Sequence, residues 1–265
     1  MKRWLAAALL LLVSCATART TSNCRIVSQV NVCDDGTRTG KPLVLLHGLG
    51  GSVKMWDGWL KTFEDYRVIR IDLPGHGKSA PSDDYSVEAD AAVLREVLRQ
   101  LSVKDFALAG HSLGGFRAWY LAQEDLTRPH VTDLILIAPI GLEPQPNWFD
   151  RIPRPLLSIG RLFLRDSWID RVWPCRWWSD ETGGLEDIEA RTLILWGGND
   201  PMRGRCCFDR RIRDSTLVIV PNAGHLLLKK PETVAAARKF LDGTLAAASP
   251  ETCPEPCPAS RQPCR

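Results

Sequence analysis

The chain has 265 residues, of which 45% are hydrophobic and 25% charged, and its net charge is +3. This length is sufficient for one domain with a substantial core, and the composition is that of an ordinary globular protein. Because basic and acidic side chains nearly balance, the chain offers no single-sign field for nucleic acid. We therefore expect no nucleic-acid partner.

The N-terminus, residues 1–14, predicts an export signal. A basic start is followed by an apolar run, Leu5 to Val13, that is too short to span a bilayer as a helix. The run ends in Leu12-Val13-Ser14-Cys15, which resembles the Leu-x-(small)-Cys end of bacterial lipoprotein signals. This resemblance implies cleavage before Cys15 and lipidation of its thiol, which would anchor the protein to a membrane.

The residues around Cys15 leave one alternative open and indicate a location. A plain secretory peptide cut near Ala16 or Ala18 would discard Cys15. For a lipidated Cys15, the following Ala16 in place of Asp implies, by the same resemblance, sorting to the outer membrane. The predicted localisation is therefore the bacterial cell envelope, lipid-anchored and facing the periplasm, with residues 15–23 as a polar tether.

Eight cysteines remain after Cys15, and an even number in an exported chain indicates disulfide bonds. A bond between Cys24 and Cys33 requires a hairpin, since a straight strand would hold the two sulfurs too far apart. Metal binding at Cys253 and Cys257 is disfavoured, because no histidine lies nearby and proline crowds the segment. We expect no metal and no cofactor. The eight are Cys24, Cys33, Cys175, Cys206, Cys207, Cys253, Cys257 and Cys264.

After a strand or hairpin at residues 24–33, short apolar runs alternate with helix-like segments. Continuously apolar strands in such an alternation predict an α/β fold with a mostly parallel sheet covered on both faces. The helix-like segments include one with Trp56 and Trp59 inward and one with Ser86 as N-cap. The predicted strands are 42–46, 66–73, 106–109, 131–138, 191–196 and 215–220, and the predicted helices are 53–64, 87–101, 116–121 and 231–247.

One long insertion interrupts this alternation after the sixth strand, at about residues 143–190. It carries half of the ten Trp of the chain, and insertions at the carboxyl end of a strand commonly form a lid over a ligand crevice. Its Arg and Trp residues either pack over the pocket or rest on a membrane, and the sequence leaves both open. The predicted organisation is one domain, 24–248, with a small helical lid and a Pro/Cys-rich tail, 249–265.

A Gly-x-Ser-x-Gly motif, Gly110-His111-Ser112-Leu113-Gly114, stands between the strand 106–109 and the helix 116–121. A turn this sharp forces its central residue into a strained, positive-φ conformation and leaves room only for small neighbours. The turn exposes the Ser112 hydroxyl and directs the free N–H groups of the helix start at any anion formed there. Ser112 is therefore the candidate nucleophile.

A serine nucleophile needs a base, and the base needs an orienting acid. His225 follows the strand 215–220 in Pro-Asn-Ala-Gly-His, and Asp200 follows the strand 191–196 in Gly-Gly-Asn-Asp. The chain order Ser112, Asp200, His225 is the nucleophile–acid–base order of α/β-hydrolases. Glu143, after the preceding strand, is the alternative acid.

The chain thus resembles the α/β-hydrolase superfamily from Lys41 to Gly243. The shared motifs are P-L-V-L-L-H-G-L-G-G, I-D-L-P-G-H-G-K-S, G-H-S-L-G-G, L-I-L-W-G-G-N-D-P and P-N-A-G-H. The resemblance implies an α/β-hydrolase fold, an oxyanion hole formed by the backbone N–H groups of Leu49 and Leu113, and a disulfide from Cys175 to Cys206 or Cys207. The chain departs from the family where Lys229-Lys230 replaces an acidic residue before Pro231.

The implied activity is that of a serine hydrolase, esterase- or lipase-like, that cleaves a small carboxylic ester or acyl substrate through an acyl-enzyme. A serine nucleophile argues against epoxide hydrolases and haloalkane dehalogenases, which use Asp. A carbon–carbon bond hydrolase or a cofactor-free perhydrolase of the same fold would use the same triad. A non-catalytic ligand-binding lipoprotein is the alternative from a different class. Nothing in the sequence indicates an oligomeric state.

Overall fold

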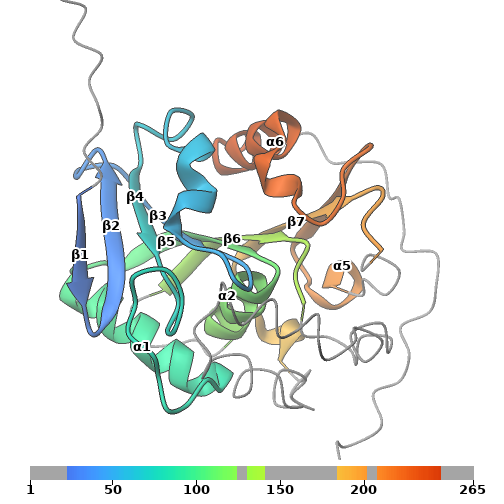
Figure 1. The fold of residues 1–265 in the computed structure, drawn as a ribbon. Helices are drawn as coiled ribbons and strands as arrows, with labels where there is room; N and C mark the ends of the chain where they lie inside the picture. Colours follow the sequence, from blue (N-terminus) through green and yellow to red (C-terminus); the bar gives the residue numbers. More distant parts are fainter. Residues whose placement is uncertain (1–22, 124–129, 141–183, 202–207, 246–265) are drawn as a thin grey trace, which may run out of the picture.

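A computed structural model of the chain describes residues 23–123, 130–140, 184–201 and 208–245. Eight strands form one sheet in the order β1-β2-β4-β3-β5-β6-β7-β8 (Figure 1). β2 runs antiparallel to β1 and to β4, and every other neighbouring pair is parallel. The strands are β1 (Cys24–Val27), β2 (Val30–Gly36), β3 (Pro42–Leu46), β4 (Arg67–Ile71), β5 (Asp105–His111), β6 (His130–Ile137), β7 (Arg191–Gly197) and β8 (Ser215–Val220).

Helical segments cover both faces of this sheet, as the alternation predicts. α1 (Val87–Gln100) and α2 (Leu113–Gln123) lie on one face, and α6 (Pro231–Leu241) lies with the 3₁₀ segment η1 (Val53–Trp59) on the other (Figure 1). Three shorter segments are η2 (Leu185–Asp187), α5 (Phe208–Arg211) and η4 (Leu227–Lys229). The Ser86 hydroxyl accepts a hydrogen bond from the N–H of Ala89 at 3.2 Å, which confirms the predicted N-cap of α1.

The register of the parallel strands aligns their carboxyl ends at one edge of the sheet. Leu46 pairs with Gly110, His111 with Ile137, and Gly197 with Val220. In β5, every residue after Asp105 is buried, as expected for a strand packed on both faces. The loops that carry the candidate site residues therefore leave the sheet side by side.

Of the strand or hairpin that the sequence left open for residues 24–33, the structure has the hairpin. β1 and β2 place the two residues opposite each other, and a disulfide joins them. The two-residue turn uses Ser28 and Gln29, both with positive φ (47° and 66°). Nothing in the sequence signals this turn, because the Asn-Gly or Asp-Gly pairs that favour two positive φ angles are absent from it.

We expect removal of this disulfide to destabilise the protein without affecting the candidate site. A crosslink that closes a short loop stabilises a protein by about 2–3 kcal/mol, so the Cys24→Ala/Cys33→Ala double variant should melt several degrees lower. Calorimetry of the native protein and the double variant without a reductant measures the effect, because a reductant would also open the disulfides predicted among the other cysteines. Equal melting temperatures for the two proteins under oxidising conditions would contradict the prediction.

Two predicted helices differ from those observed. The segment 53–64 was expected to be an amphipathic helix, but only Val53–Trp59 is helical, and it is a 3₁₀ helix. Its buried residues, Val53, Trp56 and Trp59, recur every third position, which matches the three-residue period of a 3₁₀ helix better than the 3.6-residue period of an α-helix. The inward position of both Trp side chains is confirmed.

The last helix ends earlier than predicted, at Leu241 instead of about residue 247. Gly243 has φ +70°, and the N–H groups of Gly243 and Thr244 bond to the carbonyls of Phe240 and Lys239 at 3.0 and 2.8 Å. This pair of bonds is a Schellman motif, in which a left-handed glycine terminates the helix.

Several predictions fall outside the described residues and stay predictions. They are the signal peptide (1–14), the tether up to residue 22, lipidation of Cys15, most of the lid, the acid alternative Glu143, the bond from Cys175 to Cys206 or Cys207, and the tail (249–265). Within the described ranges, no helix is both long and apolar enough to cross a membrane.

Candidate active site

Ser112 lies in the sharp turn predicted between β5 and α2. Its φ is +52°, in the left-handed region that a side chain rarely adopts. A Cβ added to Gly110 would lie 2.2 Å from the carbonyl oxygen of Gly114, and one on Gly114 would lie 2.3 Å from that of Leu46. The chain therefore requires glycine on both sides of Ser112, because the turn, the helix and β3 approach closely there.

The structure brings together the three residues that the sequence places on separate loops. The Ser112 Oγ lies 2.9 Å from His225 Nε2, and the His225 Nδ1 lies 2.9 Å from Asp200 Oδ2. The Asp200 side chain is fully buried, whereas that of His225 is 27% exposed and so remains accessible from outside. The arrangement is that of a nucleophile, a base and an orienting acid.

The loops of Asp200 and His225 are connected through their backbones. Asn199 donates its N–H to the carbonyl of Ala223 at 2.9 Å, and Gly198 donates to that of Val220 at 2.9 Å. A Cβ on Gly197 would lie 2.4 Å from the Ala223 carbonyl oxygen, so glycine is required for this approach. The contact between the loops fixes the acid relative to the base.

The loop after β3 passes directly beside Ser112. A Cβ on Gly48 would lie 3.2 Å from the Ser112 Cβ. In the described part of the chain, no hydrogen bond uses the backbone N–H of Leu49 or of Leu113, the first residue of α2. Backbone N–H groups without a partner near a serine hydroxyl can stabilise a negative charge that forms there.

His47 fixes the conformation of this loop. Its Nδ1–H donates to the Gly48 carbonyl at 2.8 Å, and its Nε2 accepts the N–H of Leu73 at 3.0 Å. Complete burial lowers the pKa of His47 to about 4, so the ring is neutral at neutral pH and can both donate and accept.

Asp72 is a buried residue whose role the sequence did not reveal. One oxygen of its carboxylate accepts the N–H of Val53 at 2.6 Å, and the other accepts the N–H of Lys78 at 2.9 Å and the Asn31 amide at 2.8 Å. It therefore joins the start of η1, which follows the Gly48–Leu49 loop, to the loop after β4. The Asp-Leu-Pro-Gly-His-Gly motif drew attention to this segment. It could not identify the partners of Asp72, because most of them are distant in the sequence.

His111 is a second such residue, since the sequence showed it only as a member of the Gly-x-Ser-x-Gly motif. Its Nε2–H donates to the backbone carbonyl of His225 at 2.8 Å. Its Nδ1 is buried, faces Gly48, and has no hydrogen-bond partner among the described residues. Burial, reinforced by the nearby His225, lowers the pKa of His111 to about 4. A neutral ring thus connects the nucleophile turn to the loop of the base.

The remaining histidines lie apart from this centre. His76 is buried and donates from Nδ1 to the Pro74 carbonyl at 2.9 Å, while His130 begins β6 at the opposite edge of the sheet. Within the described ranges, no cluster of three or more His, Cys, Asp or Glu side chains could hold a metal ion.

Comparisons with known proteins agree with this fold. A family described as "alpha/beta hydrolase fold" matches residues 41–164. The sn-1-specific diacylglycerol lipase ABHD11 of Mus musculus is 37% identical over 116 residues, which are 42% of this chain and 37% of that protein. The 2-succinyl-6-hydroxy-2,4-cyclohexadiene-1-carboxylate synthase of Escherichia coli is 39% identical over 92 residues, 33% of this chain and 36% of that one.

A solved structure covers much more of the chain. The crystal structure of a membrane phospholipase A, a bacterial virulence factor, aligns with a TM-score of 0.71 and 24% identity over 84% of this chain and 86% of that one. At this identity the likeness shows the fold alone. The chain has an α/β-hydrolase fold, and the matches together support the α/β-hydrolase superfamily. The chain spans only 36–38% of the length of the curated relatives it matches.

Proposed function

We propose that the protein is a serine hydrolase that cleaves carboxylic esters through an acyl-enzyme, with Ser112 as nucleophile, His225 as base and Asp200 as acid. The observation that carries this proposal is the continuous hydrogen-bonded chain from Ser112 Oγ through His225 to the buried Asp200. It supports the proposal because such a chain activates a serine hydroxyl, which is otherwise a weak nucleophile.

The first half of the reaction forms the acyl-enzyme. Ser112 Oγ attacks the ester carbonyl carbon while His225 Nε2 accepts its proton, and Asp200 stabilises the imidazolium through the Nδ1–H bond. The carbonyl oxygen becomes an oxyanion, which accepts hydrogen bonds from the N–H groups of Leu49 and Leu113. Each such donor contributes about 3 kcal/mol to the stability of the transition state. The C–O bond then breaks, and His225 returns the proton to the leaving alcohol.

The second half releases the acid. A water molecule attacks the acyl carbon as His225 accepts one of its protons, and the same two N–H groups stabilise the new oxyanion. Collapse of this intermediate breaks the bond to Ser112 Oγ, which regains its proton from His225. The products are a carboxylic acid and an alcohol, and neither a metal nor a cofactor takes part in these steps.

The mouse relative that matches part of this chain is named a lipase, which agrees with ester cleavage. The Escherichia coli relative is named a synthase, so it leaves room for a second candidate in which the same residues act on a bond other than an ester, such as a carbon–carbon bond. A perhydrolase would share the triad, whereas a ligand-binding lipoprotein would not turn substrate over.

The release of p-nitrophenol from short p-nitrophenyl esters tests the proposal. An ester hydrolase gives steady turnover, preceded by a burst of product equal to the enzyme concentration when deacylation is slower than acylation. Asp200→Asn should reduce the rate strongly, while Glu143→Ala should not. Activity that survives Asp200→Ala but is lost in Glu143→Ala would show that Glu143 is the acid. No release of p-nitrophenol under any condition would favour the other candidates.

His111 is expected to affect catalysis through the position of His225. His111→Leu removes the donor to the His225 carbonyl and should lower kcat about 10- to 100-fold with little change in KM, whereas His111→Gln can keep a donor and should recover most of the activity. Steady-state kinetics on both variants measures kcat and KM separately. An equal loss in both, accompanied by equal loss of thermal stability, would mean that His111 matters only for packing.

For the location, we propose anchoring to the outer membrane through Cys15, on the periplasmic side. The Cys24–Cys33 disulfide supports export, since such bonds persist in oxidising compartments. Cys15→Ala in the full-length gene should leave the precursor uncleaved or release soluble protein, as seen by membrane fractionation and intact mass. Unchanged processing and mass would contradict the anchor but leave the proposed activity untouched.

A further inference from the structure

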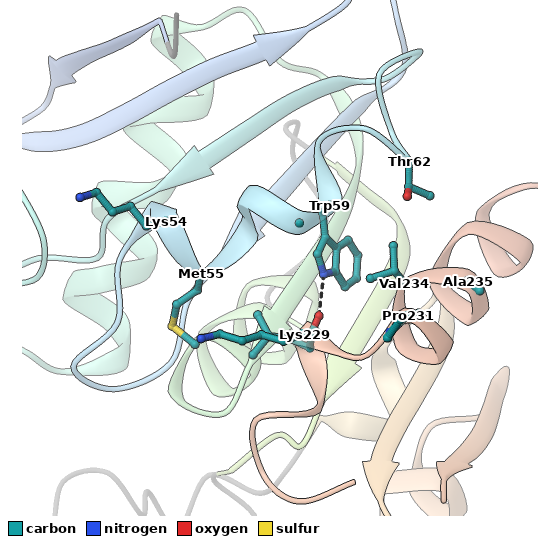
Figure 2. Close-up of a pocket in the computed structure, with 10 residues that line it drawn as sticks. Lys54, Met55, Trp59, Thr62, Lys229, Pro231, Val234 and Ala235 are labelled. Atoms are coloured by element: carbon teal, nitrogen blue, oxygen red, sulfur yellow. Dashed lines mark hydrogen bonds between the residues drawn. The ribbon is translucent and has the colours of Figure 1, made fainter. Parts of the chain in front are cut away.

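A groove of about 530 Å³ lies between η1 and the start of α6, on the face of the sheet opposite α1 and α2 (Figures 1 and 2). This volume is within the range of small-molecule sites. The Trp59 Nε1–H donates to the Leu228 carbonyl at 2.9 Å, which joins the two walls at the back. The apolar lining consists of Met55, Trp59, Leu228, Pro231, Val234 and Ala235.

The groove is separate from the catalytic centre. Among the described residues that line it, none is Ser112, Asp200 or His225. It is nevertheless close in sequence to both loops of that centre, since η4 follows His225 and η1 follows the loop of Gly48 and Leu49. A ligand in the groove would therefore contact segments next to the active site without entering it.

The charged residues of the lining are both basic. Lys229 extends along one wall with its ammonium beside Met55, while Lys54 comes from the other wall and points away from the groove (Figure 2). Neither lysine belongs to any ion pair among the described residues, and no acidic residue is among the described lining. Lys229 also begins the Lys229-Lys230 pair, which departs from the sequence pattern of the superfamily.

We propose that this groove binds a single-chain anionic amphiphile. Its alkyl chain would lie along the partly exposed Met55 and Val234, over the buried Trp59, and its carboxylate or phosphate would pair with the Lys229 ammonium. An apolar lining favours the chain, and an unpaired lysine at its edge favours an anionic head over a neutral or cationic one. The proposal concerns a site other than the active site and does not depend on the proposed ester hydrolysis.

Gly58 makes the groove testable without disturbing the fold. It lines the groove, its φ is not in the left-handed region, and a Cβ added to it would meet nothing within 4 Å. Gly58→Leu should therefore place an isobutyl group in the groove while the protein stays folded, since a glycine is replaced where its special conformation is not needed.

The experiment is calorimetric titration of the full chain with octyl, decyl and dodecyl phosphate below their micelle concentrations. We expect one binding event that is lost in Gly58→Leu and at least 10-fold weaker in Lys229→Glu. Affinity should rise about threefold to fourfold per added methylene while the chain fits the groove. Lys104→Glu, the same charge change just before β5 at the opposite edge of the sheet, should bind as the native protein does. Melting temperatures verify that all variants are folded.

Three results would overturn the proposal. Binding that persists in both Gly58→Leu and Lys229→Glu would place the amphiphile elsewhere, including in the catalytic pocket. Equal affinity for dodecyltrimethylammonium would remove the role of charge. Binding only to vesicles containing anionic phospholipid, with none to the monomeric alkyl phosphates, would mean that the basic surface contacts headgroups and that the groove takes no chain.

Discussion

Ser112→Ala is expected to abolish ester hydrolysis, with a fall in kcat/KM of about 10⁴-fold or more. The other groups of the site can still bind the substrate, but no residue can replace the hydroxyl that lies 2.9 Å from His225 Nε2. Burst kinetics and labelling by a fluorophosphonate measure the effect, and the label should be found on Ser112 alone. The melting temperature should not fall.

Ser215→Ala is the matched control for this change. Ser215 begins β8, remote from the catalytic edge, and its hydroxyl donates to the Asp209 carbonyl at 3.2 Å. This variant should keep full activity and full labelling. A label found on another serine, or activity that survives Ser112→Ala, would refute the assignment of the nucleophile.

Acid is expected to destabilise the fold well above the pH at which most carboxylates titrate. Burial lowers the pKa of His47 and His111 to about 4 and that of His76 to about 3, whereas an unfolded histidine titrates near 6.5. The unfolded chain therefore binds more protons between these values. Each neutral ring contributes to the free energy of unfolding. This contribution is fully present above pH 6.5 and is lost as the pH falls to about 4, and the loss is about 3 kcal/mol for each ring taken alone.

The free energy of unfolding, measured by denaturant titration at half-unit steps from pH 4 to 7, tests this expectation. His111→Gln removes one of the three rings and should make the free energy of unfolding depend less steeply on pH. The control is His130→Gln, at a partly exposed residue on the other edge of the sheet, which should leave this pH dependence unchanged. The carboxylates of Asp34, Asp65 and Asp133 have lowered pKa values, so their contribution to the free energy of unfolding is fully present above pH 3.8 and is lost only below it. A flat profile between pH 4 and 6.5 would contradict the neutral, buried state of the histidines.

Local sequence rules predicted the parts of this structure that depend on neighbours in the chain. The glycines at positions 110 and 114 indicated the turn at Ser112, because a side chain at either one would collide with backbone. The length of a strand showed that a Cys24–Cys33 bond requires a hairpin, and the structure has both the hairpin and the bond. The meeting of Ser112 with His225, across 113 positions, followed from a general property of parallel sheets, whose carboxyl ends share one edge.

Interactions set by three-dimensional packing could not be predicted in the same way. Asp72 accepts a hydrogen bond from the backbone N–H of a distant loop, and His111 donates one to the backbone carbonyl of another. No side-chain pattern in the sequence indicates such partners. The 3₁₀ form of η1 depends on Trp56 and Trp59 filling the space between β3, β4 and η4. The groove beside Gly58 exists only because two segments, 170 positions apart, leave a gap between them.

The position of β8 at the edge of the sheet has a consequence for synthesis of the protein. β3, β5 and the turn at Ser112 come earlier in the chain, whereas β8, which precedes His225, is the last of the described strands and pairs only with β7. A nascent chain therefore has its nucleophile long before its base. During folding, the Ser112 hydroxyl therefore lacks its hydrogen bond to His225 until β8 has docked on β7.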